Sequence, residues 1–388
     1  MSDTYDDHKK YTYFITGGGT GGHIYPAIAI CDALKKDPET KEIYYVGNPK
    51  NLEYDIAQKA GYKFLGVDVS GMPRKIGLTG GFKLIKWVFQ LQFAIFKALY
   101  YIKKYKPGAV LGTGGYVSAP ALFAAGIAGV PFMIHDSDAQ PGIVSKYIAP
   151  NAKCVSLAFE VSKQFIKSQN VHINGNPIRE EFKTLTKKES RENSGLQNKL
   201  TLCIMGGSQG AKSINDAAVE ILKELSLKYN LQIIFQTGKK NYDKVFSQLK
   251  EVYPEFEADK NIIFKPYFDN MVEVLKSTDI AVSRAGSLSL SELCACSIAS
   301  ILIPYPHAAA DHQRKNAQFM VDKRATLYLE DADTTKDTLL IAIEQLLDNP
   351  EKLNTIQQNA FALAKLDATK DIVSQLKGIT YTNSQLNK

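Results

Sequence analysis

Short, almost wholly apolar runs alternate along this chain with longer stretches in which apolar residues recur every three or four positions. The runs have the length and character of strands buried on both faces, and the stretches between them have the period of helices. The expected strands are residues 11–16, 42–47, 64–67, 109–111, 132–135 and 154–157, followed by 200–205, 232–236, 262–265, 280–283, 300–303 and 325–329. This alternation predicts an α/β fold with parallel sheets that helices cover on both faces.

The two sets of strands indicate two similar domains. Each set opens with a strand and a glycine-rich turn, at 17–23 and 206–210, and a polar segment fills 183–199 between them. We expect the division near Asn174–Arg179, with an N-terminal domain over 1–178, a C-terminal domain over 179–365 and a last segment over 366–388. Ligands of parallel sheets bind at the carboxyl ends of the strands, so the cleft between the domains is the expected active site.

The first turn holds five glycines and a threonine and ends on His23. Glycine lets backbone amides approach a phosphate closely, and Pro26 suits the first turn of a helix whose N-terminus attracts anions. Histidine exchanges a proton near neutral pH. The turn therefore offers both a phosphate cradle and a candidate base.

A nicotinamide-dinucleotide site is the first alternative for this turn, because Gly17, Gly19 and Gly22 fit G-x-G-x-x-G. That site also needs an acid at the end of the second strand to hold a ribose. The expected second strand ends in Gly47 and Asn48, without an acid. The pattern therefore gives the dinucleotide only weak support.

Two further short motifs allow other chemistry. Residues 206–213 nearly match a phosphate-binding P-loop, but Ala211 stands where the second glycine is required. We favour a diphosphate held by Ser208 and backbone amides. Asp136-Ser137-Asp138 matches the D-x-D pattern that chelates a metal-nucleotide in some glycosyltransferases, and this alternative stays open.

The second half carries two groups suited to a nucleotide sugar. Residues 283–292 follow an expected strand and open a helix, so Arg284 and the next amides suit a phosphate, and Glu292 suits two ribose hydroxyls. A solvated helix acid is the plainer interpretation of Glu292 alone. Residues 307–316 gather hydrogen-bonding groups that fit sugar hydroxyls: Asp311, His312, Gln313 and Asn316.

The net charge of +7 is modest, but it is unevenly distributed. Between Asp68 and Asp136 there is no acidic residue, and the basic residues there are Arg74, Lys75, Lys83, Lys86, Lys97, Lys103, Lys104 and Lys106. This field indicates an anionic partner. It overlaps an expected helix over 82–106 with two apolar stripes, one of aliphatic residues and one of Phe89, Phe93, Phe96 and Tyr100. The second stripe suits an interfacial membrane contact, and burial on both sides is the alternative.

The remaining composition is that of an ordinary globular chain. The five cysteines lie in expected helices and strands without metal-ligand spacing, which favours reduced cytosolic thiols. The polar N-terminus is unlike a secretory leader, and no uncharged apolar run reaches the length of a membrane span.

Six motifs stand in order: G-G-T-G-G-H (18–23), G-G-Y-V-S (114–118), G-N-P-I-R (175–179), G-G-S-Q-G-A (206–211), R-A-G-S-L-S-L-S-E (284–292) and D-H-Q-R-K-N-A (311–317). From Tyr11 to about Leu366 the chain resembles the MurG family, the UDP-N-acetylglucosamine transferases that convert lipid I to lipid II in bacterial peptidoglycan synthesis. The resemblance implies two Rossmann-like domains facing across a cleft (the GT-B architecture), a C-terminal helix that returns to the first domain, and an inverting transfer without a bound metal or other cofactor.

Carried over by position, the resemblance implies His23 as the general base and Asp136 as a second catalytic residue. The residues it implies at the UDP-GlcNAc donor are Thr20, Gly21, Gly22, Asp138, Arg179, Ser208, Gln209, Phe268, Arg284, Ala285, Gly286, Ser287, Leu288, Glu292, Gln313 and Asn316. Those it implies at the lipid I acceptor, which is undecaprenyl-linked, are Gly17, Gly18, Gly19, Arg74, Gly114, Gly115, Tyr116, His135 and Ser145. In the donor set, Arg179 and Ser208 would contact the diphosphate, the Phe268 backbone uracil, Glu292 ribose, and Gln313 and Asn316 the GlcNAc hydroxyls.

The resemblance further implies an anionic membrane surface bound through 74–106, a peripheral place on the cytoplasmic face of the bacterial cell membrane, a cell-wall synthesis complex and no nucleic-acid partner. The chain departs from the family at 135–142, where it reads H-D-S-D-A-Q-P-G instead of H-E-Q-N-x-x-P-G. Asp136 shortens the reach of the acid, and Asp138 replaces an amide. Two other functions stay open: the same fold acting on another lipid acceptor, and an inactive membrane-docked scaffold that binds a nucleotide sugar.

Overall fold

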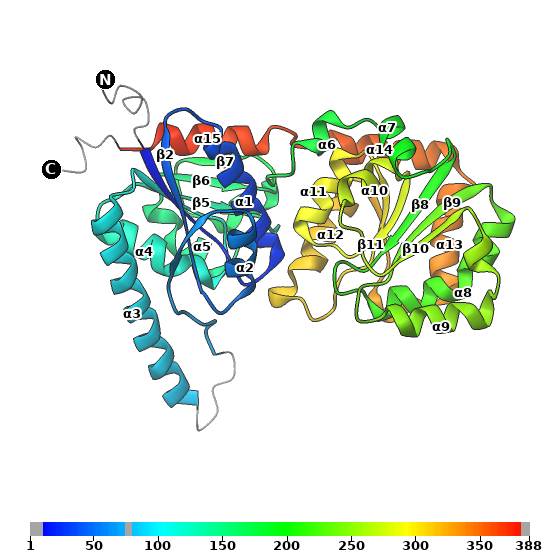
Figure 1. Cartoon of the computed structure of the whole chain (residues 1–388), viewed down its shortest axis with the longest axis horizontal. Helices are drawn as coiled ribbons and strands as arrows, with labels where there is room; N and C mark the ends of the chain where they lie inside the picture. Colours follow the sequence, from blue (N-terminus) through cyan, green and yellow to red (C-terminus); the bar gives the residue numbers. More distant parts are fainter. Residues whose placement is uncertain (1–10, 74–79, 382–388) are drawn as a thin grey trace, which may run out of the picture. The chain divides into compact units, whose positions relative to one another are not determined.

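The computed structural model describes residues 11–73 and 80–381 and divides the chain into two compact units (Figure 1). Unit 1 takes the described residues up to Ile178 together with those from Asp367 onward, and unit 2 runs from Arg179 to Leu366. Each unit has one parallel sheet, in the orders β3-β2-β1-β4-β5-β6-β7 and β10-β9-β8-β11-β12-β13. The predicted α/β class with two parallel sheets is confirmed.

The strands of unit 1 are β1 (Tyr11–Thr16), β2 (Thr40–Gly47), β3 (Lys63–Gly66), β4 (Ala109–Gly112), β5 (Phe132–Asp136), β6 (Cys154–Leu157) and β7 (Val171–Ile173). Its helices are α1 (Gly21–Lys35), α2 (Leu52–Lys59), α3 (Gly80–Tyr105), α4 (Ala119–Ile127), α5 (Ile143–Ile148) and α15 (Ala368–Gly378), with short 3-10 turns η1 (Tyr116–Ser118), η2 (Ala149–Asn151) and η3 (Glu160–Phe165).

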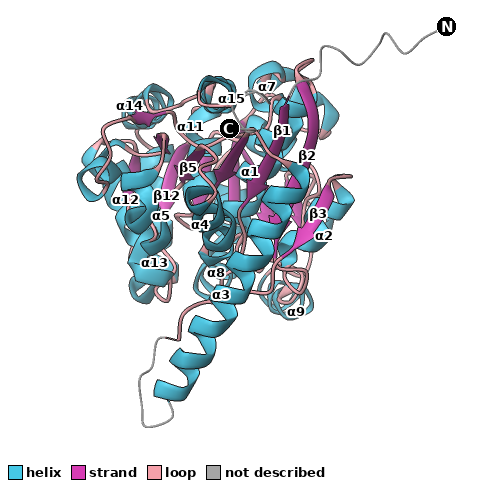
Figure 2. Ribbon diagram, turned by 90° about the vertical axis from the view of Figure 1, so that its left-hand side faces the viewer, coloured by secondary structure: helices cyan, strands magenta, loops and turns pink. Residues whose placement is uncertain are grey.

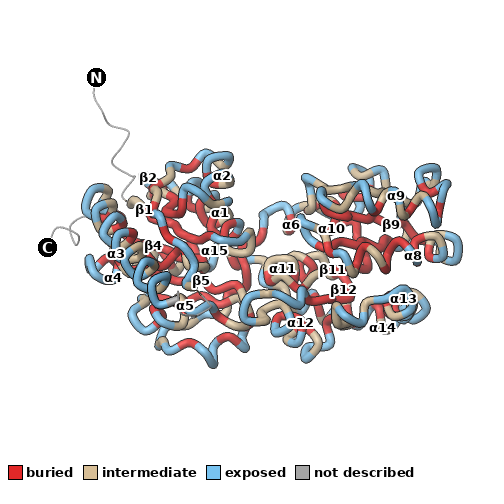
Figure 3. Tube along the Cα trace, turned by 90° about the horizontal axis from the view of Figure 1, so that it is seen from below, coloured by how far each residue is buried: buried red, intermediate tan, exposed pale blue. Residues whose placement is uncertain are grey.

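Two apolar layers enclose the sheet of unit 1, because successive strand residues point to opposite faces. In β1, Phe14 joins the layer that contains Val110 and Phe132, whereas Tyr13 and Ile15 join the other layer. That second layer is closed by α1 and by α15, which arrives from the far end of the chain. Figure 3 shows the strands as the buried interior and the helix surfaces as the exposed rim.

Helix α3 extends past the other elements of unit 1 (Figures 1 and 2). Its C-terminal half packs on the sheet through Ala94, Ala98 and Ile102, which are buried. The aromatic stripe predicted for its other side is exposed, with Phe93 at 73% and Phe96 at 68% of their accessible surface. The predicted alternative of a helix buried on both sides is therefore wrong.

The strands of unit 2 are β8 (Leu200–Met205), β9 (Leu231–Gln236), β10 (Ile262–Lys265), β11 (Ile280–Ser283), β12 (Ala299–Leu302) and β13 (Thr326–Tyr328). Its helices are α6 (Glu181–Thr184), α7 (Lys187–Asn193), α8 (Lys212–Lys228), α9 (Tyr242–Val252), α10 (Met271–Ser277), α11 (Ser287–Ala295), α12 (His312–Asp322), α13 (Lys336–Leu347) and α14 (Pro350–Ala362), with 3-10 turns η4 (Phe256–Ala258), η5 (Ala309–Asp311) and η6 (Asp331–Asp333).

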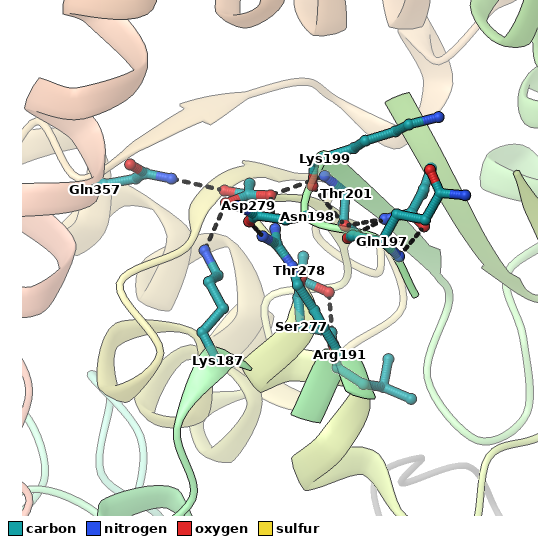
Figure 4. A network of polar contacts seen from close by, with 12 residues as sticks. Lys187, Arg191, Gln197, Asn198, Lys199, Thr201, Ser277, Thr278, Asp279 and Gln357 are labelled. Atoms are coloured by element: carbon teal, nitrogen blue, oxygen red, sulfur yellow. Dashed lines mark hydrogen bonds and ion pairs between the residues drawn. The ribbon is translucent and has the colours of Figure 1, made fainter. Parts of the chain in front are cut away.

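A buried polar network fastens α7 to the amino end of this sheet (Figure 4). Asp279, just before β11, accepts from the Arg191 guanidinium at 2.7 Å and from the Thr201 backbone at 2.8 Å, and it also pairs with Lys187. Thr186 begins α7 with a capping box, which sets the direction from which Arg191 enters. The network lies at the amino ends of the strands, on the opposite side of the sheet from their carboxyl ends.

The expected strands all occur, and their ends differ from the observed ones by no more than two residues. The strand β7 was not predicted. It has only three residues, Val171–Ile173, with an exposed histidine in the middle and polar segments on both sides. A run so short has no apolar pattern, and it is a strand because it pairs with β6 at the edge of the sheet.

Candidate functional site

In unit 1, the loops that follow β1 and β4 lie against each other. The Gly18 amide donates to the Gly114 carbonyl at 3.4 Å, and the Thr113 hydroxyl donates to the His23 carbonyl at 2.7 Å. A Cβ atom on Gly115 would lie 2.1 Å from the Gly18 carbonyl oxygen, and Gly115 has a φ of 76°. Only glycine fits there, since both the contact and the backbone angle exclude a side chain.

The His23 ring lies over this junction. A Cβ atom on Gly114 would be 2.8 Å from His23 Nδ1, so the ring packs directly on the β4 loop. Within the described chain, Nδ1 is buried and has no hydrogen-bond partner. The other ring nitrogen, Nε2, is therefore the one available to a substrate hydroxyl.

The glycine loop runs straight into α1, whose N-terminus is open. Thr20 occupies the N-cap position but, among described residues, no side chain caps the helix, and its first turn has no acid. Free amides at a helix N-terminus attract an anion. Gly21 and Gly22 belong to this turn, next to His23.

His135 is enclosed in unit 1. It is fully buried, with Nδ1 3.0 Å from the Ser156 hydroxyl and Nε2 3.2 Å from the Asn176 side-chain oxygen. Burial lowers the pKa of His135 to about 4, so the ring is neutral. Because both nitrogens have partners, this residue supports the end of β5 and presents no free nitrogen to an acceptor.

Asp136 organises the loop where the chain departs from the family pattern. Its carboxylate accepts from the Gly142 amide at 3.0 Å and the Asp138 amide at 3.3 Å. Burial raises the pKa of Asp136, although a hydrogen bond from Ser145 opposes the shift. Asp136 and Ser145 thus fix the turn that begins α5. No cluster of three or more metal-ligating side chains occurs within residues 11–73 and 80–381.

Tyr116 borders the glycine loop, and Arg74 lies outside the described residues. A Cβ atom on Gly19 would be 3.3 Å from the Tyr116 ring, and the Tyr116 hydroxyl accepts from the Asn51 side chain at 3.1 Å. Gly17, Gly18, Gly19, Gly114, Gly115 and Tyr116 of the expected acceptor set therefore lie together with His23.

In unit 2, the turns after β8 and β11 also lead into helices with open N-termini. The turn after β8 exposes Ser208 and Gln209 in front of α8, and Gly286 precedes α11. Over the part of unit 2 that is described, neither helix has a side-chain cap or an acid in its first turn. Both ends therefore suit phosphate oxygens.

The Arg284 guanidinium is engaged within the protein. It donates to the Asp331 carboxylate at 2.5 Å, to the Ile303 carbonyl at 3.0 Å and to the Pro304 carbonyl at 3.2 Å. The side chain is mostly buried. Arg284 thus joins the loops after β11, β12 and β13, and its expected contact with a phosphate stays a prediction.

Glu292 lies on α11 with the Arg179 guanidinium 3.9 Å away. Burial raises the pKa of Glu292 to about 7, and the Arg179 charge opposes the shift. A mostly enclosed carboxylate next to a cation is an unusual helix acid, and perturbed groups of this kind gather at functional sites.

The other donor candidates are partly occupied by internal hydrogen bonds. The Phe268 amide donates to the Gln236 side chain at 3.0 Å, and the Gln313 side chain accepts from the Tyr305 amide at 2.9 Å. Asn316 is fully buried and donates to the Ala285 carbonyl at 3.2 Å. Asn316 therefore anchors the turn Ala285–Leu288 in front of α11.

Three residues of these sites were missed from the sequence: Glu53, Gln236 and Asp331. Glu53 accepts from the Gly19 amide, Gln236 bridges the Gly207 carbonyl and the Phe268 amide, and Asp331 holds Arg284. None stands in a glycine-rich motif. The one available signal was that Gln236 follows the apolar run of residues 233–235 at the end of its strand.

The chain is similar in sequence to known proteins. The chain matches the family model of the glycosyltransferase family 28 N-terminal domain over residues 13–157 and that of the family 28 C-terminal domain over 201–376. A relative from Desulforamulus reducens, named UDP-N-acetylglucosamine–N-acetylmuramyl-(pentapeptide) pyrophosphoryl-undecaprenol N-acetylglucosamine transferase, is 39% identical over 94% of this chain and 98% of its own length. A relative with the same name from Carboxydothermus hydrogenoformans is 37% identical over 94% and 96%.

Solved structures are also similar. The crystal structure of Acinetobacter baumannii MurG has a TM-score of 0.75 and 25% identity, covering 95% of this chain and 99% of that one. UDP-GlcNAc 2-epimerase from Neisseria meningitidis, bound to UDP-GlcNAc, has a TM-score of 0.65 and 14% identity, over 95% and 99% of the two chains. At that identity the epimerase supports the fold alone.

Proposed function

We propose that this chain, which belongs to the MurG family within glycosyltransferase family 28, transfers GlcNAc from UDP-GlcNAc to lipid I and so forms lipid II. The observation that carries the proposal is 37–39% identity to enzymes of that name over 94% of the chain. The chemistry of the two units supports it. Unit 1 offers a base, His23, beside the open N-terminus of α1, and unit 2 offers the open N-termini of α8 and α11 and a carboxylate, Glu292, that suits ribose hydroxyls.

His23 acts as the general base in this proposal. Its Nε2 takes the proton from the acceptor hydroxyl as that oxygen attacks the anomeric carbon of GlcNAc, which inverts the configuration. The contact of the ring with Gly114 and the anchored His23 carbonyl support the assignment, because both restrict the ring to one position. The glycine loop and Tyr116 border the acceptor, and Thr20, Gly21 and Gly22 lie toward the transferred sugar.

The donor is held in unit 2. The diphosphate rests on the amides in front of α8 and α11, with Ser208, Gln209 and Arg179 beside it, and the amides stabilise the charge on departing UDP. Arg284 and Asn316 also hold the α11 turn in place. In the proposal, the Arg284 charge stabilises the departing UDP, and Asn316 contacts the GlcNAc hydroxyls. Glu292 accepts the ribose hydroxyls, the Phe268 backbone contacts uracil, and Gln313 contacts the sugar. Asp138, which lies in unit 1, is also proposed to contact the donor.

Because the proposed acceptor is a lipid, we expect unit 1 to contact a membrane surface. The exposed aromatic stripe of α3 is flanked by exposed lysines, including Lys83, Lys86 and Lys97, and such a face suits an anionic interface. Among the described residues, no helix combines the length and apolar character needed to cross a bilayer. We propose a peripheral position on the cytoplasmic face. Membership of a cell-wall synthesis complex also stays a prediction.

The proposal is tested by transfer of labelled GlcNAc from UDP-GlcNAc to a short-chain lipid I analogue, by the full chain in EDTA. Product would support the donor and acceptor together. If product formed only after Mg²⁺ or Mn²⁺ was added, Asp136 and Asp138 would become metal-ligand candidates. No product under either condition would contradict the lipid I assignment and favour another acceptor or a binding scaffold.

His23→Ala is expected to lower turnover by about 10²–10⁴-fold, because it removes general-base catalysis. Binding of UDP-GlcNAc, measured by calorimetry, is expected to stay unchanged, since the donor candidates of unit 2 are untouched. His172→Ala is the matched control, because His172 is exposed on the edge strand β7. Near-normal turnover of His23→Ala would show that the base is another group.

A further inference from the structure

Glu53 is a buried carboxylate that the mechanism above does not use. It lies in the first turn of α2, where it is fully shielded from solvent. No Lys, Arg or His side chain pairs with it anywhere in residues 11–73 and 80–381; its partners are all N–H groups. Charges are rarely buried without a cation unless several hydrogen bonds satisfy them.

The three donors to Glu53 come from different segments. Its Oε2 accepts from the Gly19 amide at 3.2 Å, and its Oε1 accepts from the Asn48 amide at 3.2 Å and the Asn51 side chain at 3.3 Å. Hydrogen bonds to a carboxylate are stronger than those between neutral groups. Glu53 thus ties the glycine loop to the end of β2 and the start of α2.

The glycine loop is shaped around this carboxylate. A Cβ atom on Gly18 would lie 2.6–2.9 Å from the carboxyl atoms of Glu53, so the loop backbone packs directly on them. The Gly19 amide, which the glycine-rich sequence offered to a phosphate, already donates to Glu53. The anion-binding capacity of the turn therefore shifts to the open end of α1, next to His23.

A relay extends the effect to the β4 loop. Asn51 donates to Glu53 and also to the Tyr116 hydroxyl at 3.1 Å, and the Tyr116 ring covers Gly19. The two loops that enclose His23 are therefore connected through one carboxylate and one amide.

We infer that Glu53 is a positioning residue for the acceptor side of the reaction. It sets the Gly17–Thr20 loop and, through Asn51, the Tyr116 phenol, so that the acceptor meets His23 in a fixed geometry. This inference rests on the proposed function and adds to it a residue that touches neither substrate.

The test compares full-chain variants in the transfer assay, with separate kcat and KM values for the lipid I analogue and for UDP-GlcNAc. Glu53→Gln keeps the shape but turns an NH₂ group toward N–H donors. We expect it to lower kcat/KM for the acceptor by about 10–100-fold, because small displacements of reacting groups cost about that much. The KM for UDP-GlcNAc should change by less than about twofold, as the groups proposed to hold its UDP part lie in unit 2.

Two further variants separate positioning from folding. Asn51→Ala leaves the carboxylate in place but removes the relay to Tyr116 together with one of the three hydrogen bonds to Glu53. A loss of about fivefold in the same acceptor parameter is expected. Asp55→Asn is the control, since it removes one negative charge from the exposed side of the same helix. Thermal unfolding of every variant, and calorimetric binding of the acceptor analogue, accompany the kinetics.

Normal acceptor kinetics in both Glu53→Gln and Asn51→Ala would overturn the inference. It would also fail if Glu53→Gln impaired donor and acceptor equally while Asn51→Ala had no effect, because that pattern marks a folding residue. If the wild-type chain transfers no GlcNAc, the proposed function fails. In that case the affinity of the variants for the acceptor analogue tests the role of Glu53 separately, and an unchanged affinity would contradict it.

Discussion

In the proposed mechanism, the protonation of Glu292 is expected to govern donor binding. Its pKa is raised to about 7, mainly by burial, so the carboxylate is largely ionised at pH 8 and largely protonated at pH 6. An ionised carboxylate accepts from both ribose hydroxyls, whereas a protonated one must donate through one oxygen. The proton therefore competes with the nucleotide for this group.

Affinity for UDP-GlcNAc is accordingly expected to fall about tenfold from pH 8 to pH 6. The sign for stability is opposite: a carboxyl group with a raised folded-state pKa contributes most below its unfolded value, and the contribution is lost as pH rises through about 7. Calorimetry with UDP-GlcNAc is suitable because its diphosphate diester does not titrate in this range. Glu292→Gln should give weaker, pH-independent binding, and an unchanged pH dependence in that variant would assign the effect elsewhere.

The sequence could identify individual site residues only where a local motif requires that residue type. His23 is recognisable because it ends the glycine loop. Gly115 was implied by the family resemblance, and the structure shows why only glycine fits there. Glu53 and Asp331 could not be found this way, since their partners Gly19 and Arg284 lie 34 and 47 positions away. Those pairs exist only once parallel strands bring the loops together.

At the scale of single elements, α3 carries the membrane hypothesis. Phe93 and Phe96 of its aromatic stripe are mostly exposed, so changing them should leave the fold intact. We expect Phe93→Gln with Phe96→Gln to weaken binding to anionic vesicles by about tenfold or more, since a buried Phe contributes about 1.5–3 kcal/mol. Sedimentation with vesicles measures the change.

Phe361→Gln is the control for α3, because Phe361 is an exposed aromatic residue on α14 of unit 2. Transfer to a water-soluble acceptor analogue should be unaffected by the α3 variant. Equal vesicle binding by the variant and the wild type would mean that α3 is not the docking element.

The helix α7 shows the opposite case, an element held by charge. Arg191→Met removes one partner of the buried pair with Asp279, and the loss is expected to be about 3 kcal/mol of unfolding free energy in unit 2. Lys188→Met is the matched control, since its pair with Glu192 on the same helix is exposed and should contribute under about 1 kcal/mol. Urea unfolding followed by circular dichroism compares them, and equal losses would contradict a buried ion-pair role.

Elements with a clear apolar period were predictable, and those held by other means were not. The strand β11 is an apolar run, so its place was evident, whereas Val171–Ile173 became a strand only through its neighbour β6. The packing of α7 depends on Asp279, a residue 88 positions from Arg191, and no local pattern announces it.

At the scale of the whole molecule, the last helix belongs to the first unit. Helix α15 packs on α1 and buries Ile372, Val373 and Leu376 in the same layer as Tyr13 and Ile15. Its Gln375 exchanges hydrogen bonds with Asn174, and its Lys377 pairs with Asp37. The sequence alone gave no sign of this return; only the resemblance implied it.

A chain that ends at Leu366 is therefore expected to lose roughly 5 kcal/mol from unit 1, because three aliphatic side chains at about 1.5–3 kcal/mol each become exposed. That loss is comparable with the whole stability of a typical domain, which is about 5–15 kcal/mol. Unit 2 keeps all its elements, so UDP-GlcNAc binding should persist while transfer is lost. The single tryptophan, Trp87, lies on α3 and reports unit 1 by fluorescence during urea unfolding. Supplying α15 again, fused behind Leu366 by a glycine linker, should restore the transition, and a truncated chain with unaltered Trp87 unfolding would show that unit 1 is stable without its distant helix.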